Sequence, residues 1–405
     1  MPVRRGGVRR VLLCAIGLSA VLSPAACRSG GGDGASPGAP GPSRPAVATV
    51  DVTPVDGATA VRLDAPVTVS SNGVPFDAVA VSGPDGRPVA GSFTPDRTRW
   101  VSSGGLAPAT RYRVAARTTP GPGGTPAAVS RTSTFTTLTP TSLLKVSWEP
   151  VDGQVVGIGA PVTLQFTAAV PDRAAVQRRL LVRTSPAVEG AWHWFSDQEV
   201  RWRPRYYWQP GTKVHVEARL AGYDGGNGLW GVKDRTMDFR IGDRRVSYVD
   251  GQQHTMTVTR DGKVVRVIPV SLGRDQYPTM EGPHNVIETS PEVVMDSATV
   301  GIPQGSPDYY YEKVYWNVKF TSGGEYVHAA PWSVGSQGRV NVSHGCVNTS
   351  PADAQWFFGF SRVGDIVQVT GTGRPPDTSQ AGNDWSIDWD TWRSGDALAG
   401  ASRPH

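Results

Sequence analysis

The chain is poor in cysteine, and this scarcity shapes what its chemistry can be. Only three cysteines occur in 405 residues. Cys14 and Cys27 fall in an N-terminal leader, which leaves Cys346 alone in the mature chain. A lone cysteine forms no internal disulfide, so a disulfide-stapled fold is excluded and Cys346 is a free thiol. An inert buried thiol needs apolar neighbours, whereas the surrounding stretch VNVSHGCVNTS at 340–350 is largely polar.

Long apolar runs are also missing, apart from one short segment near the N-terminus. Four arginines precede an apolar run at 11–22, and small residues then lead to Cys27. The run is shorter than the roughly 20 residues that a spanning helix needs, and the pattern is typical of a secretory signal at 1–27. The Ala-Ala-Cys end of the leader resembles a bacterial lipobox, although Pro24 replaces the usual leucine-like residue. We expect a lipid on Cys27, with simple secretion as the alternative.

Downstream of the leader there is no excess of positive charge. The formal net charge is +5, and the four leader arginines account for all but one of these charges. No Lys/Arg stripe with interleaved aromatic residues follows, so nucleic acid is excluded as a partner. No CxxC or HExxH motif occurs either. Zinc would accept His328, His344 and Cys346 as ligands, but a fourth ligand has no candidate at a motif-like spacing. We expect no metal and no cofactor.

The first half of the chain contains an internal repeat. A Gly/Pro/Ser-rich stretch at 28–46 reads as a flexible tether. The motif PVDG at 54–57 then recurs at 150–153, and each copy continues with short alternating runs broken by Gly, Pro and Asp-Gly. This pattern is typical of an immunoglobulin-like β-sandwich. We predict two such domains, at 47–138 and 139–243, that act as spacers or contact the cell wall.

The sequence pattern of the second half predicts a different β-rich domain at 244–372. Asp261-Gly262 favours a tight hairpin, and Ser350, followed by proline, is a good cap for a short helix after the cysteine. Three tryptophans in the tail at 373–405 are expected to dock it onto a neighbouring domain. The predicted fold class is therefore mainly β, with two sandwiches, a β-rich catalytic domain and a Trp-rich tail.

A cysteine nucleophile needs a base, because the thiolate is the reactive form. Among the seven histidines, His328 ends a predicted strand and is the expected base. His344 lies only two residues before Cys346, where its ring tends to point away, so it is expected to support the loop. Gly345 permits a sharp turn that exposes N–H groups to an oxyanion. His284 is expected at the surface, although a role in the cleft stays open.

These residues resemble a known signature. Ser343-His344-Gly345-Cys346-Val347-Asn348 begins fifteen positions after His328, and this arrangement is similar to the motif of L,D-transpeptidases of the YkuD type. The resemblance extends over 273–284 and 328–357. Two preceding Ig-like copies and a Trp-rich tail resemble the actinobacterial form of the family.

The resemblance implies a cell-wall cross-linking enzyme on the outer face of the cell membrane, anchored through Cys27. In that family a cysteine attacks the diaminopimelic carbonyl of a donor tetrapeptide stem and expels the terminal D-Ala. The thioester is then resolved by a side-chain amine of an acceptor stem, which gives a 3→3 cross-link. Carbapenems are the expected covalent inhibitors. An L,D-carboxypeptidase that uses water, or a non-catalytic wall-binding lipoprotein, stays open as an alternative.

The resemblance also implies roles for individual residues. The catalytic set is Cys346, His328, His344, Gly345 and Tyr310, and the substrate-binding set is Asn348, Met295, Trp332, Ser343 and Tyr309. Tyr310 matches the tyrosine of a hairpin lid at 286–310, but Tyr309 and Tyr311 are adjacent alternatives. Close relatives often have Ser at the position of Ala329. Because alanine has no hydroxyl, we expect the backbone carbonyl of Ala329 to orient His328.

Overall fold

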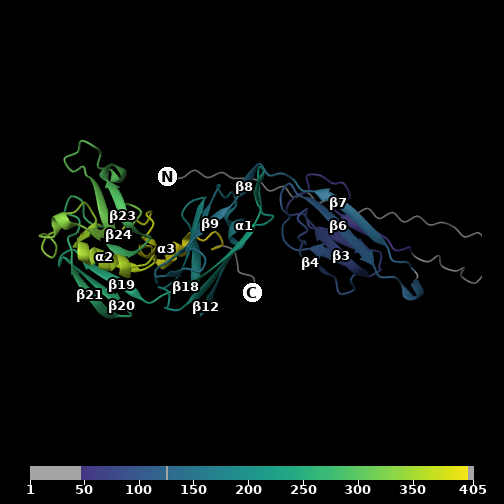
Figure 1. Cartoon of the computed structure of the whole chain (residues 1–405), viewed down its shortest axis with the longest axis horizontal. Coiled ribbons are helices and arrows are strands. Elements are labelled where there is room, and N and C mark those ends of the chain that lie inside the picture. The colour runs from purple at the N-terminus through teal and green to yellow at the C-terminus, as the bar shows by residue number, and fades with distance from the viewer. Residues whose placement is uncertain (1–46, 125, 400–405) are drawn as a thin grey trace, which may run out of the picture. The chain divides into compact units, whose positions relative to one another are not determined.

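The computed structural model describes residues 47–124 and 126–399, and this part of the chain is mainly β (Figure 1). The predicted fold class is confirmed. The leader, the tether and Cys27 lie outside the described residues. Within them, no helix has the length and apolar character required to cross a lipid bilayer.

The first seven strands form a sandwich of two antiparallel sheets. One sheet has the order β1-β2-β5-β4 and the other β3-β6-β7. Their inner faces bury aromatic side chains, among them Trp100 and the stacked pair Tyr112 and Phe135. The strands are β1 (Val50–Thr53), β2 (Thr68–Ser71), β3 (Phe76–Ser82), β4 (Gly91–Phe93), β5 (Arg99–Ser102), β6 (Arg111–Thr118) and β7 (Ser130–Thr136), with a 3-10 turn η1 at Pro122–Gly124.

The second sandwich has a larger core that is rich in tryptophan. Its sheets have the orders β10-β18-β15-β12 and β13-β14-β11-β9, and Trp192, Trp194, Trp202 and Trp208 are buried between or beside them. The elements are β9 (Val146–Glu149), β10 (Val155–Val156), β11 (Val162–Phe166), α1 (Arg173–Gln177), β12 (Leu180–Ser185), β13 (Gly190–Trp194), β14 (Glu199–Pro204), β15 (Lys213–Arg219) and β18 (Asp234–Ile241). A small sheet combines β8 (Ser142–Leu144), β16 (Asp224–Gly226) and β17 (Leu229–Gly231).

The repeated PVDG motif makes the same turn in both sandwiches. The carboxylates of Asp56 and Asp152 each accept a backbone N–H from the last strand of their own sandwich, at 2.7 and 2.8 Å. Gly57 and Gly153 follow with φ of +76° and +77°, a conformation that glycine adopts without strain. The sequence repeat therefore reflects a structural repeat.

The remaining strands form two sheets that share one core. The first has the order β21-β20-β19-β27-β22 and the second β23-β24-β25-β26. Helix α2 (Pro351–Phe360) packs against β24 and β25, and its first turn is capped by the Ser350 hydroxyl, as predicted. The strands are β19 (Arg245–Asp250), β20 (Thr255–Arg260), β21 (Lys263–Pro269), β22 (Gly282–Asn285), β23 (Glu288–Asp296), β24 (Tyr311–Lys319), β25 (Tyr326–Ala329), β26 (Val347–Thr349) and β27 (Ile366–Thr370).

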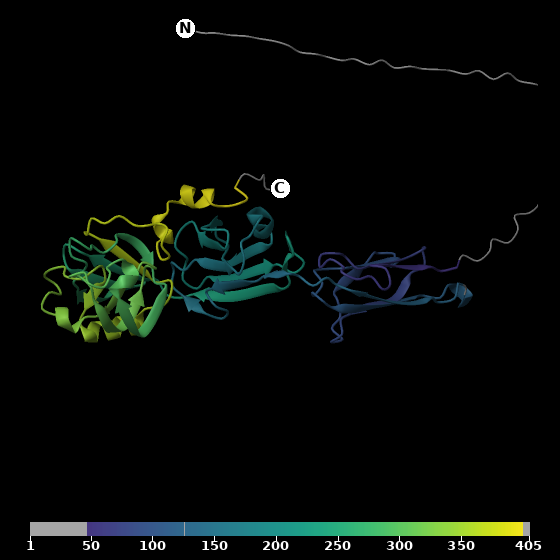
Figure 2. The same ribbon diagram turned by 90° about the horizontal axis from the view of Figure 1, so that it is seen from above.

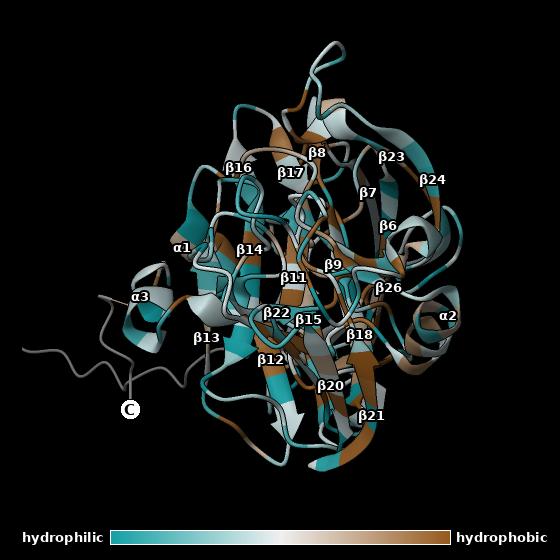
Figure 3. Ribbon diagram, turned by 90° about the vertical axis from the view of Figure 1, so that its left-hand side faces the viewer, coloured by the Kyte–Doolittle hydropathy of each residue, from teal (hydrophilic) through white to brown (hydrophobic). Residues whose placement is uncertain are grey.

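Strand β21 forms an exposed edge of the first sheet. Val264 and Val267 are 60% and 57% exposed, and Figure 3 shows the hydrophobic colour along this strand. Lys263 and Arg266 interrupt the apolar run. Charged side chains on an edge strand discourage pairing with another chain.

The C-terminal segment returns to the second sandwich (Figure 2). Trp392, in helix α3 (Trp389–Ser394), is fully buried, and its indole N–H donates to Ala191 O at 3.0 Å. The His193 ring stacks on it and bonds to Trp392 O at 2.8 Å. Trp385, in the 3-10 turn η4 (Asp384–Ser386), donates to Gly159 O at 2.8 Å.

Two buried arginines of β14 hold this segment. The Arg203 guanidinium lies 4.5 to 5.4 Å from the ring centres of all three tail tryptophans, and burial lowers its pKa to about 10. Arg201 makes an ion pair with Asp384 at 2.9 Å and a second with Glu199. This pairing offsets the cost of burying the Arg201 charge, whereas Arg203 donates to Ile387 O at 2.7 Å.

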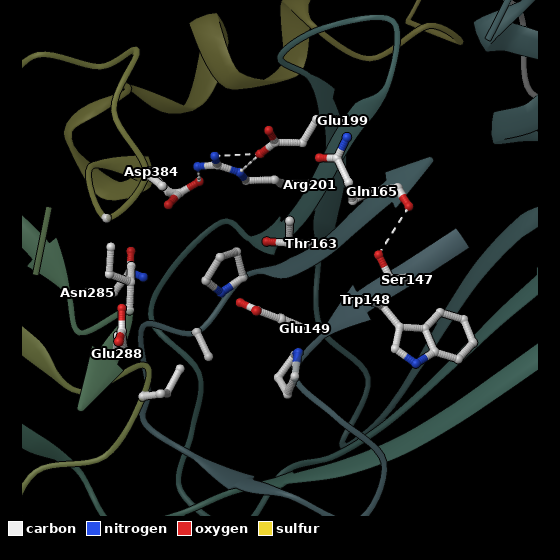
Figure 4. A pocket seen from close by; sticks show the side chains of 17 residues that line it. Ser147, Trp148, Glu149, Thr163, Gln165, Glu199, Arg201, Asn285, Glu288 and Asp384 are labelled. Atoms are coloured by element: carbon white, nitrogen blue, oxygen red, sulfur yellow. Dashed lines mark hydrogen bonds and ion pairs between the residues drawn. The ribbon is translucent and has the colours of Figure 1, made fainter. Parts of the chain in front are cut away.

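Arg201 also lines a cavity of about 410 Å³ between the second sandwich and the residues around β22 (Figure 4). Figure 4 shows Arg201 held between Glu199 and Asp384, with Asn285 and Glu288 on the side of Asp384. The lining residues include neither cysteine nor histidine. This cavity therefore cannot be the site of cysteine chemistry.

Truncation of Trp392 tests the docking of the tail. Trp392→Ala should weaken the docked state by about 3–5 kcal/mol, because it removes a fully buried aromatic side chain. Hydrogen exchange of the amides at 389–394 measures this loss. Tyr206→Ala is the matched control, because Tyr206 is 72% exposed; equal protection in the two variants would contradict the prediction.

Candidate active site

One cavity of about 250 Å³ gathers most of the residues singled out from the sequence. They come from the lid hairpin, from β25, from the segment after β25 and from the cysteine loop. The predicted residues that line it are Met295, Tyr310, His328, Trp332, Ser343, His344, Cys346 and Asn348. Gly345 lies within the loop, and Tyr309 is not among the lining residues.

Parallel pairing of β25 with β26 brings His328 to the cysteine loop. His328 lies opposite Asn348, and Val327 lies opposite Val347. Side chains two residues apart on a strand project to the same face, so Cys346 projects to the face of Asn348. Because Asn348 lies opposite His328, the thiol and the imidazole share this face. Two segments that are distant in sequence thus present a thiol and an imidazole to one cavity.

The imidazole of His328 is buried and held in one orientation. Its Nδ1 lies 2.9 Å from Ala329 O, which can only accept, so Nδ1 carries the proton and Nε2 is free to act as a base. Burial lowers the pKa of His328 to about 4, against the weaker opposing effect of the carbonyl. The ring is therefore neutral at pH 7.

The thiol of Cys346 is also buried and neutral. It is 8% exposed, and Sγ donates to Gly324 O at 3.6 Å. Burial raises the pKa of Cys346 to about 12; the Tyr326 N–H favours the thiolate, and the charge of Glu325 opposes it. The resting pair is a thiol and a neutral imidazole, so the structure does not support a resting ion pair.

Local hydrogen bonds shape the loop that carries the cysteine. The Ser343 hydroxyl accepts from Gly345 N–H at 3.1 Å and donates to Cys346 O at 2.6 Å. Gly345 has φ of +128°, which only glycine adopts readily. The Asn348 amide donates to the Ser333 hydroxyl at 3.0 Å and ties the loop to the segment after β25.

His344 packs between two tyrosines. Its ring centre is 5.1 Å from that of Tyr277 and 4.9 Å from that of Tyr310. Nε2 lies 4.0 Å from Asp308 Oδ1, beyond a hydrogen bond. Burial and the Arg274 charge lower the pKa of His344. This environment suits packing better than proton transfer.

The hairpin of β23 and β24, joined through the 3-10 turn η2 (Ser297–Val300), covers the cavity from one side. Tyr310 is fixed just before β24, because its N–H donates to the Ser297 hydroxyl at 3.0 Å. Burial raises the pKa of Tyr310, with a smaller effect of Cys346, so its hydroxyl stays protonated. Tyr311 is 65% exposed, and the Tyr309 hydroxyl accepts from Gln304. Of the three, Tyr310 is the one that lines the cavity.

Comparison with known proteins agrees with this geometry. A family model described as the L,D-transpeptidase catalytic domain matches residues 244–369, and a bacterial Ig domain model matches 58–224. L,D-transpeptidase 2 of Mycobacterium tuberculosis is 40% identical over 403 residues, which cover 98% of this chain and 97% of the relative. The chain belongs to the L,D-transpeptidase family.

Two further relatives support this assignment. L,D-transpeptidase 5 of Mycobacterium tuberculosis is 35% identical over 363 residues, which cover 88% of this chain and 76% of the relative. A solved L,D-transpeptidase in complex with imipenem is 40% identical, covers 57% of this chain and 100% of its own, and superposes with a TM-score of 0.50.

In this L,D-transpeptidase the sequence prediction missed several residues of the cavity. Glu312, Val314 and Val342 also line it. The first two follow Tyr310 at a spacing of two, which is the period of one strand face. That alternation in DYYYEKVYW was the signal that could have revealed them.

His284 was predicted at the surface, and this prediction is wrong. The side chain is fully buried on β22, with Nδ1 2.5 Å from Asn383 Oδ1 and Nε2 3.0 Å from Met280 O. Its partners come from the tail and from the segment before β22, so the exposed-looking stretch EGPHNV conceals a core residue. Within residues 47–124 and 126–399, no cluster of three or more His, Cys, Asp or Glu side chains could hold a metal.

The neutral resting pair has a measurable consequence. Because burial raises the pKa of the thiol to about 12, Cys346 should react with iodoacetamide at least about tenfold more slowly than free cysteine at pH 8. The rate should still rise above pH 9. Mass analysis of the peptide that carries Cys346 measures it, with glutathione as the control. A fast reaction with a plateau at pH 6–7 would instead indicate an ion pair.

Proposed function

We propose that this L,D-transpeptidase forms 3→3 peptide cross-links in peptidoglycan through a thioester on Cys346. The observation that carries the proposal is the single cavity lined by a thiol, a neutral imidazole with a free Nε2 and a protonated tyrosine hydroxyl. These are the groups that acyl transfer by a cysteine requires.

In the proposed acylation, Cys346 attacks the diaminopimelic carbonyl of a donor tetrapeptide stem. Thiol and imidazole have pKa values of about 12 and 4, so a free thiolate–imidazolium pair is unfavourable. The proton therefore passes from sulfur to Nε2 of His328 as the C–S bond forms. Negative charge then develops on the substrate oxygen rather than on the sulfur.

Donors around the cysteine loop stabilise that charge. Tyr310 keeps its hydroxyl proton, because burial raises its pKa, and Gly345 turns the loop so that backbone N–H groups can point into the cavity. The protonated His328 next gives its proton to the departing amine. The C–N bond breaks, D-Ala leaves, and the stem remains as a thioester on Cys346.

The acceptor amine enters from the other side of Tyr310. A second cavity of about 240 Å³ shares Tyr310 and His344 with the first. A second binding region beside the cysteine loop favours a transferase that binds two stems over a carboxypeptidase that uses water. The lid hairpin limits access of bulk water to the thioester.

The cellular setting follows from the family and from the leader. Relatives in this family are L,D-transpeptidases of mycobacteria, and peptidoglycan lies outside the cell membrane. We place the protein there, anchored by a lipid on Cys27, with the two sandwiches as spacers between membrane and substrate. A relative has been solved in complex with imipenem, and we expect carbapenems to acylate Cys346.

The central test uses a disaccharide-tetrapeptide. The wild-type protein should release D-Ala and yield a cross-linked dimer, which mass spectrometry resolves from the tripeptide that water would produce. Cys346→Ala should yield neither product and should gain no adduct mass with imipenem, while its thermal unfolding stays native. An adduct on Cys346→Ala would locate the nucleophile elsewhere, and tripeptide alone would support the carboxypeptidase.

The role of Tyr310 is tested separately. Tyr310→Phe should slow acylation by imipenem about 100-fold, the typical cost of one oxyanion donor. Tyr309→Phe is the matched control and should keep the wild-type rate, because Tyr309 does not line the cavity. Stopped-flow measurement of both variants decides which tyrosine contributes.

A further inference from the structure

A buried carboxylate, Glu325, lies directly behind the cysteine loop and takes no part in the proton transfers above, although it also lines the second cavity. It immediately precedes β25 and is 5% exposed. Its Oε1 accepts from the Met280 N–H at 2.9 Å and from the Arg374 guanidinium at 3.0 Å. The Thr321 hydroxyl donates to its Oε2 at 3.3 Å. Glu325 therefore joins three segments that are distant in sequence.

Glu325 and the residue before it each contact the cysteine loop. Its Oε1 lies so close to Gly345 that a Cβ on this glycine would be 3.5 Å away. The preceding residue, Gly324, supplies the carbonyl that accepts the Cys346 thiol proton. The hydrogen bonds of the Glu325 carboxylate thus hold the turn on which the resting thiol depends.

The charge of Glu325 acts in the same direction as this hydrogen bond. Burial raises the pKa of Glu325, and the Met280 N–H and the charge of Arg374 oppose this rise by favouring the charged carboxylate. A negative charge close to a thiol disfavours the thiolate, and the charge of Glu325 adds to the rise in the pKa of Cys346 that burial mainly causes. The other titratable groups near the thiol are His328, His344, Tyr310 and Tyr326, and the Arg274–Asp308 ion pair lies beside His344.

We propose that Glu325 is a positioning residue that keeps the Cys346 thiol protonated and bound to Gly324 O until a substrate carbonyl arrives. The inference rests on the proposed role of Cys346 as the nucleophile. A lone thiol outside the cytoplasm meets oxidants, and these react with the thiolate. The carboxylate therefore restrains a reactive group during the time when no substrate is bound.

Two variants of Glu325, one without its charge and one that keeps it, test the proposal. Glu325→Gln keeps the size of the side chain but removes its charge, so Cys346 should react with iodoacetamide at least about threefold faster at pH 8, which corresponds to half a pKa unit. Glu325→Asp keeps the charge and shortens the side chain, so the same reaction should stay within about twofold of the wild-type rate. Glu217→Gln, in the second sandwich, is the control for the loss of one carboxylate. The full chain is used, and the rate is read from the mass of the peptide that contains Cys346.

Each outcome is decisive. A faster reaction in Glu325→Gln together with a near wild-type rate in Glu325→Asp supports the proposal, whereas equal changes in both variants, or unmoved pH–rate curves, would mean that Glu325 has only a structural role and would overturn it. If thermal unfolding shows that Glu325→Gln does not fold, Glu325→Asp decides alone: a near wild-type rate supports the proposal, and alkylation at least about threefold faster overturns it. Alkylation does not require cross-linking activity. A wild-type protein that forms no dimer would therefore refute the proposed function and leave this test intact.

Discussion

The candidate site depends on the pairing of two short parallel strands. His328 lies in β25 and β26 follows directly after Cys346, and the register of the two strands sets the imidazole and the thiol on one face of the sheet. Parallel strands cannot be joined by a tight turn, and the connection between these two carries Trp332, Ser333 and the cysteine loop. The long connection that the topology requires is thus also the segment that lines the cavity.

Desolvation is the common cause of the site's electrostatics. It raises the pKa of Cys346 and of Tyr310 and lowers that of His328, so all three groups are neutral at rest. Because these three groups are neutral, the resting site contains no charge that would need bulk water to stabilise it. Charge appears only when a substrate carbonyl supplies an oxygen to carry it, and the donors that surround that position then act in a low dielectric.

The described part of the C-terminal tail packs against the second sandwich and does not line the active-site cavity. Trp392 of the tail is buried in the second sandwich. There Arg203 contacts the indole rings of all three tail tryptophans. The sequence indicated the docking role of the tryptophans, because aromatic side chains near a terminus need a partner surface. It did not indicate Arg203, because nothing local distinguishes a buried arginine on a strand from an exposed one.

Local patterns in the sequence determined a large part of this protein: the repeated PVDG turn, the helix capped by Ser350, and a loop in which Gly345 allows Cys346 to be presented. Each depends on interactions within a few residues, which a short pattern records. Only the tertiary structure decided that His284 is buried, that Tyr310 rather than its neighbours lines the cavity, and that Glu325 lies behind the thiol. Those outcomes depend on contacts between segments that are far apart in the chain, and burial, which sets the charge of every group in the site, exists only once these segments have packed together.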